Sequence, residues 1–248
     1  MPYGLRSAVA DGSGEDRLAR YHSRRRFDTT DEPRGESVGP SEELSFVVQI
    51  HDARRTHFDF RLEVDGVLKS WAVPKGPSTD PGDKRLAVPT EDHPLEYREY
   101  EGVIASGEYG AGPVIVWDRG TYSPLGVESQ AAFAAALDRG HASFRLNGRK
   151  LRGAYALTRF RDGRDGSGEA WLLVKKAGSG STHGVRATPD PRRARSARTG
   201  RTLSEVVRDA QDDEGTRDDR GTRGRRMPDH GSSRVHRSEG NDHARRRP

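Results

Sequence analysis

The segment 57–64, HFDFRLEV, alternates polar and apolar side chains without a break, and this alternation constrains the fold more than any other feature. Successive side chains of a β-strand point to opposite faces, so one face of this segment is apolar. That face consists of Phe58, Phe60, Leu62 and Val64. The Asp-Gly pair at 65–66 favours a two-residue hairpin turn before the apolar run at 67–75. The sequence therefore predicts an antiparallel hairpin with one face buried in a core.

Five other runs have the length and composition of short strands. They lie at 45–51, 84–90, 112–118, 141–160 and 170–176, and the fourth contains an Asn-Gly pair that favours a hairpin turn. Residues 127–140 are Ala-rich, carry an acid near their start and reach Gly140 at their end, which predicts a helix. Seven or eight strands with short connections and one helix are typical of a single barrel or sandwich.

The apolar content is low for one compact domain of this length, since 31% of the 248 residues are hydrophobic and 33% are charged. Residues 1–40 have few apolar positions, and from about residue 176 the chain is mostly Gly, Ser, Thr, Arg, Asp and Pro. Such segments bury too little apolar surface to offset the conformational entropy lost on folding. The composition therefore predicts a folded unit over about residues 40–176, followed by a disordered tail.

The positive charge of the chain lies in this tail. From Arg186 to the end there are 17 arginines and 11 acidic residues, an excess of six, whereas the whole chain carries a net charge of +5. An Arg-rich flexible tail adds non-specific attraction to phosphate backbones. A solvated tail without a role is the alternative interpretation.

Several classes of protein do not fit the sequence. The chain has no cysteine, which excludes disulfides and thiolate metal sites and gives no sign of an oxidising compartment. No apolar run approaches the roughly 18–20 residues of a membrane span, and the N-terminus lacks the apolar core of a signal peptide. We expect a soluble cytoplasmic protein that does not bind membranes.

The polar face of the strand at 57–64 carries His57, Asp59 and Arg61 at alternate positions, roughly 6.5–7 Å apart. A solvated strand face is the ordinary interpretation of such a row. The same residues also offer two metal ligands and a bidentate phosphate binder, and His51 in the preceding strand can reach the same place. The pattern predicts a metal site of His51, His57 and Asp59, whose mixed N and O donors suit Mn, Fe, Zn or Ni.

Other candidate residues surround this segment. His93 and Tyr97 lie in the loop at 89–102, Lys75 ends a predicted strand, and Gln49 shares a strand face with His51. A single histidine in a loop is usually a solvent-exposed residue without a function. These residues therefore support a functional site only as a group. The Gly-rich segment 107–112 precedes a strand and not a helix, and we interpret it as a tight turn rather than a nucleotide-binding loop.

Three long stretches, at 49–78, 84–104 and 107–122, closely resemble the 3′-phosphoesterase domain of bacterial DNA ligase D. The resemblance covers about residues 20–176, and because no polymerase or ligase sequence follows here, we expect the stand-alone form of that domain. It implies a mainly β fold, a compact β-barrel of about eight strands with one or two flanking helices. We therefore divide the chain into a flexible N-terminus (1–20), a 3′-phosphoesterase domain (21–176) and a disordered basic tail (177–248).

The resemblance also implies an activity. The family uses a divalent metal, preferably Mn²⁺ with other transition metals as alternatives, to heal DNA or RNA/DNA primer–template 3′ ends during end-joining repair. It removes a terminal ribonucleoside, leaving a 3′-phosphate, and then hydrolyses that phosphate to a 3′-hydroxyl. A separate DNA ligase, a polymerase or a Ku-like end binder are the protein partners it suggests.

By motif, the resemblance assigns His51, His57 and Asp59 as metal ligands and Arg61 as a contact to the scissile phosphate. It assigns His93 as a second phosphate contact with Tyr97 beside it. Further positions that support activity are Gln49, Lys75, Arg85, Arg25 and Glu32. Arg26 departs from the family pattern, which has Asp there, and this departure bears on the ribonucleosidase step more than on the phosphatase step.

Two alternatives remain open at this point. The His57-x-Asp59 pair with a distal histidine is also the pattern of iron(II) oxygenases, although His93 is close in sequence for that role and no clear Arg-x-Ser motif follows. The other alternative is a catalytically impaired nucleic-acid-binding module of a repair complex. All the motif residues of the site are present, and Arg26 alone favours this second alternative.

Overall fold

The computed structural model describes residues 17–35, 39, 42–163, 166, 168–178, 181–182, 184 and 187–223. Its nine strands are β1 (Ser45–Asp52), β2 (Thr56–Val64), β3 (Val67–Val73), β4 (Lys84–Pro89), β5 (Gly102–Ile104), β6 (Gly112–Leu125), β7 (His141–Gly148), β8 (Arg152–Gly163) and β9 (Gly168–Lys175). The helices are α1 (Ala19–His22), the 3₁₀ helix η1 (Leu95–Glu99), α2 (Gln130–Asp138) and α3 (Leu203–Arg223).

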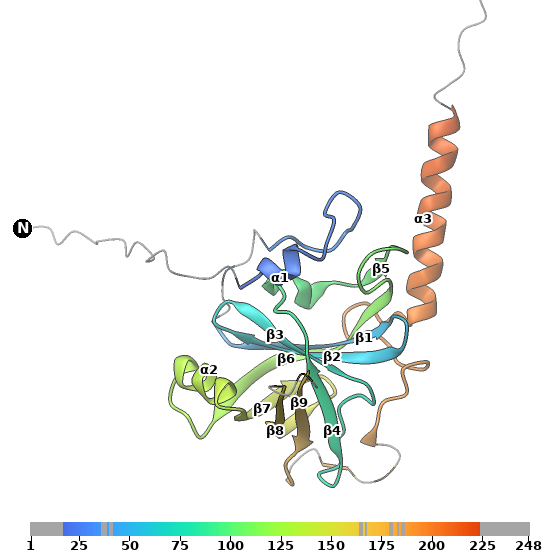
Figure 1. Ribbon diagram of the computed structural model, residues 1–248. Helices are drawn as coiled ribbons and strands as arrows, with labels where there is room; N and C mark the ends of the chain where they lie inside the picture. The colour runs from blue at the N-terminus through green and yellow to red at the C-terminus, as the bar shows by residue number, and fades with distance from the viewer. Residues whose placement is uncertain are drawn as a thin grey trace, which may run out of the picture. The chain divides into compact units, whose positions relative to one another are not determined.

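The strands form one antiparallel sheet in the order β1-β2-β3-β4-β9-β8-β7-β6-β5 (Figure 1). An additional pairing between β1 and β6 closes eight of these strands into a barrel, and β5 adds to the edge of β6. This closure confirms the predicted β-barrel and excludes the two separate sheets of a sandwich. A closed barrel leaves few unpaired strand edges, which stabilises a sheet made of short strands.

The long strand β6 makes the closure possible, because it pairs with β1 along its first part and with β7 along its second part. Gly120 lies where the two pairings meet and is aligned with both Phe46 and Gly148. A Cβ atom on Gly120 would lie 2.2 Å from the backbone oxygen of Asn147, so only glycine fits at this crossing.

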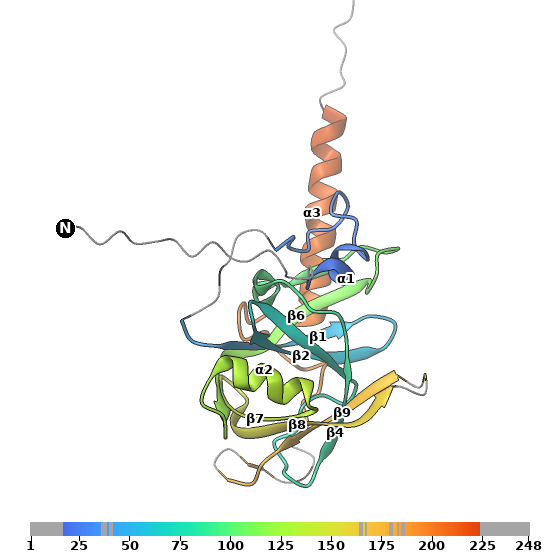
Figure 2. The same ribbon diagram turned by 60° about the vertical axis from the view of Figure 1, so that its left-hand side comes forward.

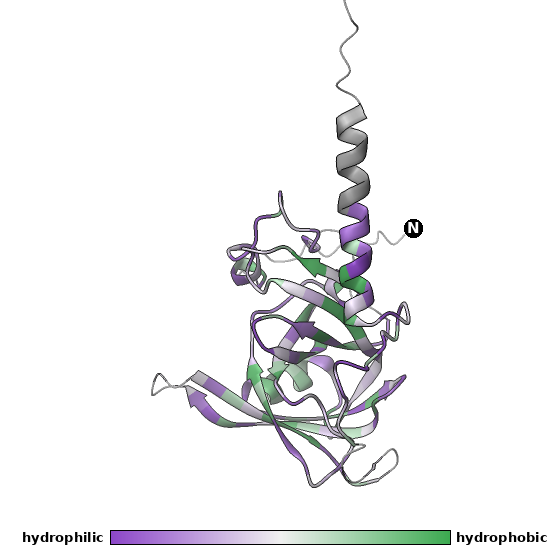
Figure 3. Ribbon diagram, turned by 90° about the vertical axis from the view of Figure 1, so that its right-hand side faces the viewer, coloured by the Kyte–Doolittle hydropathy of each residue, from purple (hydrophilic) through white to green (hydrophobic). Residues whose placement is uncertain are grey.

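The β2–β3 hairpin forms as the sequence predicts. Val64 pairs with Val67 across Asp65 and Gly66, whose φ angles of 49° and 81° are those of a tight hairpin turn. Phe58, Phe60 and Leu62 are buried in the barrel core. The predicted helix at 127–140 corresponds to α2, which begins after Ser129. The side-chain oxygen of Ser129 accepts a hydrogen bond from the N–H of Ala132 and so caps the helix. Figure 3 shows apolar stretches on the barrel strands and at the start of α3.

The polar face of β2 is not solvated, which differs from the ordinary interpretation of its sequence. Asp59, Arg61 and Glu63 are all buried. The N-terminal segment with α1 and the segment with η1 lie over this face of the barrel (Figures 1 and 2). A second apolar cluster, centred on Tyr21 and Tyr97, joins these two segments to β3. Buried charges need partners, so this face of the barrel carries the candidate functional site.

Residues 187–211 are ordered, whereas the sequence predicts disorder from residue 177. Ala187, Ala194 and Ala197 are buried, and the N–H of Ala197 donates to the carbonyl of Val116 on β6 at 2.7 Å. Val206, at the start of α3, belongs to the main core. Small alanines between arginines give no apolar periodicity, which is why the sequence pattern hid this packing. From Asp212 the chain belongs to a second compact unit, and the predicted disorder of 224–248 and of most of 1–20 falls outside the described residues.

None of the helices in the described ranges combines the length and the apolar character that a membrane-spanning segment requires.

We expect Val206→Ala to lower the free energy of unfolding by about 1–2 kcal/mol, because it removes buried apolar carbon atoms from the core. Urea denaturation followed by circular dichroism measures the change. The matched control is Arg208→Ala, two residues further along α3 and exposed, which should change stability by less than about 0.5 kcal/mol. Equal stability of Val206→Ala and the unchanged protein would contradict the packing of this segment.

Candidate metal centre

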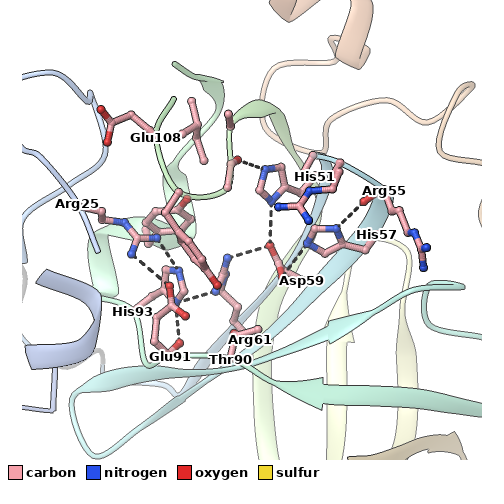
Figure 4. Close-up of a pocket in the computed structure, with 17 residues that line it drawn as sticks. Arg25, His51, Arg55, His57, Asp59, Arg61, Thr90, Glu91, His93 and Glu108 are labelled. Atoms are coloured by element: carbon pink, nitrogen blue, oxygen red, sulfur yellow. Dashed lines mark hydrogen bonds and ion pairs between the residues drawn. The ribbon is translucent and has the colours of Figure 1, made fainter. Parts of the chain in front are cut away.

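The β1–β2 hairpin brings two histidines together. The register aligns His51 directly with His57, and their rings lie 4.9 Å apart between centroids. Asp59 lies two residues further along β2, with Oδ1 3.6 Å from Nε2 of His57 and Oδ2 3.8 Å from Nδ1 of His51 (Figure 4). One ligand atom from each residue lies within 4.8 Å of the other two. The cross-strand register therefore gathers the three predicted ligands at one place.

Hydrogen bonds to backbone carbonyls orient both rings. Nε2 of His51 lies 2.6 Å from the carbonyl of Gly110, and Nδ1 of His57 lies 2.9 Å from the carbonyl of Arg55. A carbonyl oxygen only accepts, so these two nitrogens carry the ring hydrogens. The lone pairs on the other nitrogens then face Asp59. Metal-binding histidines are held in this way, with the second nitrogen donating to a carbonyl or a carboxylate.

The charges of the site favour a cation between these three donors. Burial alone would raise the pKa of Asp59, but Arg61 and the two histidines hold that pKa well below its usual range, so the carboxylate is ionised at neutral pH. Burial works to lower the pKa of His57, yet the hydrogen bond and the charge of Asp59 outweigh it and raise the pKa above its ordinary value. A positive charge is thus stabilised where the lone pairs meet.

The donor set fits a divalent transition metal. Two imidazole nitrogens and one carboxylate oxygen suit Mn, Fe, Zn or Ni, and no thiolate is available for a soft ion. Asp59 and His51 are buried, whereas His57 has 22% of its side chain exposed. These three residues all line the cavity, so a molecule in the cavity would reach a metal that they held.

Arg61 lies beside the metal donors and is almost fully engaged. Its guanidinium donates to Gln49 Oε1 at 2.8 Å, Ser70 Oγ at 2.8 Å and Asp59 Oδ2 at 3.0 Å, and its Nη1 lies 2.9 Å from Nδ1 of His93. Gln49 in turn donates to the backbone carbonyls of Tyr97 and Tyr100, which fixes the acceptor for Arg61. Of the five N–H groups of a guanidinium, at least the second one on Nη2 has no acceptor among the described residues and remains for a bound molecule.

His93 lies between two arginines. Its Nδ1 faces Arg61, and its Nε2 lies 3.3 Å from Nη2 of Arg25. Burial is the main cause that holds the pKa of His93 well below its ordinary value, and the charges of Arg61 and Arg25 lower it further. The ring is therefore neutral at neutral pH.

The N-terminal segment completes the site from the other side. Arg25 donates to Glu32 at 2.9 Å, and the hydroxyl of Tyr97 donates to the same carboxylate oxygen at 2.9 Å. Burial, and then the charge of Glu32, raise the pKa of Tyr97 well above its usual value, so the hydroxyl stays protonated. The structure thus brings Arg25 and Glu32, which lie 20 and 13 residues before the start of β1, next to His93 and Tyr97.

Two of the predicted site residues are not at this place. Lys75 is exposed in the turn after β3. Arg85, on β4, donates to Asp83 and to Thr188, both at 2.6 Å. Neither residue lines the cavity around the metal donors. An effect of Lys75 or Arg85 on activity would therefore have to act from outside the cavity.

Sequence reasoning missed Glu91. Its side chain is buried and pairs with Arg24 at 2.9 Å and with Arg25 at 3.2 Å, and its backbone carbonyl lies 2.8 Å from Nδ1 of His93. Its position two residues before His93, in a loop with several acids, carried too little signal to single it out. Gly110 was interpreted as part of a tight turn, and its φ of 78° agrees, but the role of its carbonyl towards His51 follows only from the structure.

Arg26 pairs with Glu108, with Nε 3.0 Å from Oε1, and Thr29 donates to the same oxygen at 2.9 Å. Glu108 belongs to the loop that supplies Gly110. The residue that departs from the family pattern therefore has an acidic partner of its own in this chain.

The three metal donors border one cavity of about 740 Å³, together with Arg25, Arg61, Glu91, His93, Tyr97, Glu108 and Gly110. Its walls come from the β1–β2 hairpin, the loop of Thr90 to His93, the loop of Glu108 to Ala111, and Arg25 (Figure 4). The cavity combines a cation site with several guanidinium groups, which suits an anionic molecule.

Comparison with known proteins identifies a family for this region. Residues 49–159 match the family described as "DNA Ligase D 3'-phosphoesterase domain". The multifunctional non-homologous end joining protein LigD of Pseudomonas aeruginosa is 51% identical over 163 residues, which are 64% of this chain and 18% of that protein.

The corresponding DNA repair protein LigD of Mycobacterium tuberculosis is 44% identical over 164 residues, 66% of this chain and 20% of that protein. LigD of Mycolicibacterium smegmatis is 40% identical over 165 residues, 66% of this chain and 21% of that protein. The chain thus spans about a fifth of the length of the curated relatives that it matches.

We expect His57→Ala to weaken Mn²⁺ binding by more than about 100-fold, since losing a ligand costs more than the roughly 10–100-fold loss of a supporting hydrogen bond. The fold should persist, because the ring faces the cavity and not the core. Isothermal titration calorimetry measures the affinity, and circular dichroism measures the fold. The control is His141→Ala, an exposed histidine on β7, which should bind Mn²⁺ unchanged. Full Mn²⁺ affinity in His57→Ala would rule out this ligand assignment.

The pKa of His93 predicts a pH dependence of stability. The unfolded chain takes up a proton near pH 6.5, while buried His93 resists protonation, so stability contributed by neutral His93 is present above pH 6.5 and is lost as the pH falls below it. Between pH 7.5 and 5.5 this loss amounts to about 1 kcal/mol. His93→Asn should lose less stability over the same interval, measured by urea denaturation at both pH values. Equal losses in the two proteins would show that His93 does not resist protonation.

Proposed function

The chain belongs, over the region around residues 49–159, to the DNA ligase D 3′-phosphoesterase domain family, and we propose that it is a metal-dependent phosphoesterase that heals nucleic-acid 3′ ends. Within this proposal it removes a terminal ribonucleoside and then the remaining 3′-phosphate, which yields a 3′-hydroxyl. The observation that carries the proposal is the group of His51, His57 and Asp59 in one cavity with Arg61 and His93.

His51, His57 and Asp59 would hold the metal, and Mn²⁺ is the ion that we propose. When bound, a divalent metal supplies a Lewis acid for a phosphate oxygen. Two neutral imidazoles and one carboxylate leave the ion with net positive charge, which suits an anionic ligand. The ionised state of Asp59 that Arg61 maintains is a condition for this binding.

Arg61 and His93 would bind the phosphate itself. The free N–H on Nη2 of Arg61 adjoins Asp59 and can donate to a phosphate oxygen as negative charge builds up. The ring of His93 is neutral, so it takes part through a hydrogen bond and not as a standing cation. Gln49, Glu32 and Tyr97 hold these two groups in place, which makes them positioning residues.

Water is the nucleophile that we propose. The chain has no cysteine, and the hydroxyl-bearing residues among those lining the cavity are Thr90, Tyr97 and Tyr109. The hydroxyl of Thr90 is buried, that of Tyr97 donates to Glu32, and that of Tyr109 accepts from Arg24 at 2.7 Å. The raised pKa of Tyr97 keeps its hydroxyl protonated beside Glu32, and within the described residues neither Thr90 nor Tyr109 donates to a general base that would activate it.

We propose DNA or RNA/DNA primer–template ends as the substrates, since the relatives are named as non-homologous end joining proteins. We propose that the protein acts there, in the cytoplasm, beside a separate DNA ligase, a polymerase or a Ku-like end binder. The product, a 3′-hydroxyl, is the group that a polymerase extends and a ligase joins.

The test uses two labelled primer–templates, one ending in a single 3′-ribonucleotide and one in a 3′-phosphate, each with and without Mn²⁺. We expect Mn²⁺-dependent conversion of the 3′-phosphate to a 3′-hydroxyl, resolved by gel electrophoresis. The ribonucleotide substrate shows whether the Arg26–Glu108 pair supports the first step. His57→Ala should be inactive on both, and His141→Ala should be as active as the unchanged protein.

A protein that binds Mn²⁺ and both duplexes but converts neither would be the impaired nucleic-acid-binding module considered above. Iron-dependent oxidation in place of phosphate release would instead favour an oxygenase.

A further inference from the structure

Four arginines line the cavity, and they differ in whether their guanidinium groups are already bound. Arg61 has one free N–H, as described above. Arg25 donates to Glu32, Glu91 and the backbone carbonyl of Tyr21, and its Nη2 adjoins His93. Both side chains are at most 4% exposed. These two arginines hold the site together and have little capacity left for a ligand.

Arg54 and Arg55 are different. Both are exposed, both line the cavity, and within the described part of the chain neither side chain has a hydrogen-bond or ion-pair partner. The nearest acid in sequence, Asp52, accepts a hydrogen bond from Thr56 across the same turn. Two unpaired guanidinium groups therefore border a cavity that is otherwise closely paired.

The turn between β1 and β2 fixes where these arginines lie. It connects the ligand His51 to the ligand His57, and the backbone carbonyl of Arg55 holds the ring of His57. The two side chains are thus at the edge of the cavity next to the metal donors. Figure 4 shows Arg55 on the outer side of His57, away from Asp59.

The cavity therefore offers two separate groups of residues that can bind anions. The inner wall, with the metal donors, Arg61 and His93, faces the group that reacts. Arg54 and Arg55 lie at the exposed edge of the same cavity. A guanidinium binds a phosphodiester through two parallel hydrogen bonds, so this pair suits a phosphate backbone.

We propose that Arg54 and Arg55 form a binding site for the backbone phosphates that precede the 3′ end of the substrate strand. This proposal rests on the proposed function, because it names the part of a nucleic-acid substrate that lies outside the reacting group. Its chemical requirement is a polyanionic strand, and sequence recognition is not part of it.

The test compares the full chain with the double variant Arg54→Gln/Arg55→Gln. The probe is a fluorescein-labelled primer–template with a recessed 3′-hydroxyl, the product of the proposed reaction, so Mn²⁺ can be present without turnover. Fluorescence anisotropy gives Kd at several salt concentrations between about 50 and 200 mM. Each phosphate contact contributes about 0.9 to the slope of log K against log salt.

We expect the double variant to lower the magnitude of that slope by about two and to raise Kd roughly tenfold at the lowest salt. Arg54→Lys/Arg55→Lys should keep most of the slope, because it keeps both charges. The matched control is Arg139→Gln/Arg145→Gln, which removes two exposed arginines that do not line the cavity and should leave slope and Kd unchanged.

Mn²⁺ affinity measured by calorimetry and the thermal midpoint should equal those of the unchanged protein in every variant, since only exposed side chains are altered. A slope and Kd in Arg54→Gln/Arg55→Gln equal to those of the unchanged protein, while that protein binds and converts a 3′-phosphate end, would overturn this inference and leave the proposed function intact. Absence of both binding and conversion in the unchanged protein would overturn the two together.

Discussion

The buried contact between Arg61 and Asp59 is the interaction on which the rest of the site depends. It keeps Asp59 ionised although the carboxylate is buried. The negative charge of Asp59, next to the two imidazole nitrogens, is what allows this group to bind a cation. The same guanidinium reaches towards His93 and receives its orientation from Gln49. A buried charge pair of this kind is costly to disrupt, because removing one partner leaves the other uncompensated.

This requirement explains the layer that covers the polar face of β2. Arg61, Arg25, Glu32 and Glu91 are charged and removed from water, and each finds a partner of opposite charge or a hydrogen-bonding side chain. The N-terminal segment and η1 supply those partners together with the apolar cluster around Tyr21 and Tyr97. The barrel provides one rigid wall of the site, and the covering segments supply charged partners for its buried side chains. The site therefore combines parts of the chain that are far apart in sequence.

The hairpin was predictable from local residues, and so were the three metal donors, because period-two alternation places His57 and Asp59 on one face and the pairing of β1 with β2 places His51 opposite. The engagement of Arg61 was not predictable, since its partners Ser70 and His93 come from β3 and from a loop. Glu91 lacked a local signal for the same reason. The segment 187–211 was expected to be disordered, because its buried apolar residues are isolated alanines and one valine.

The sequence by itself determined the strand pattern, the eight-stranded β class, the donor types at the candidate metal site and the family resemblance, because all of these reside in residue order over short distances. Only the tertiary structure decided that the polar face of β2 is buried, that Lys75 and Arg85 lie outside the cavity, and that Arg54 and Arg55 are unpaired while Arg25 and Arg61 are not. The physical reason is that burial and pairing are properties of side chains that meet from distant segments. Residue order along a single strand carries no information on what will cover it.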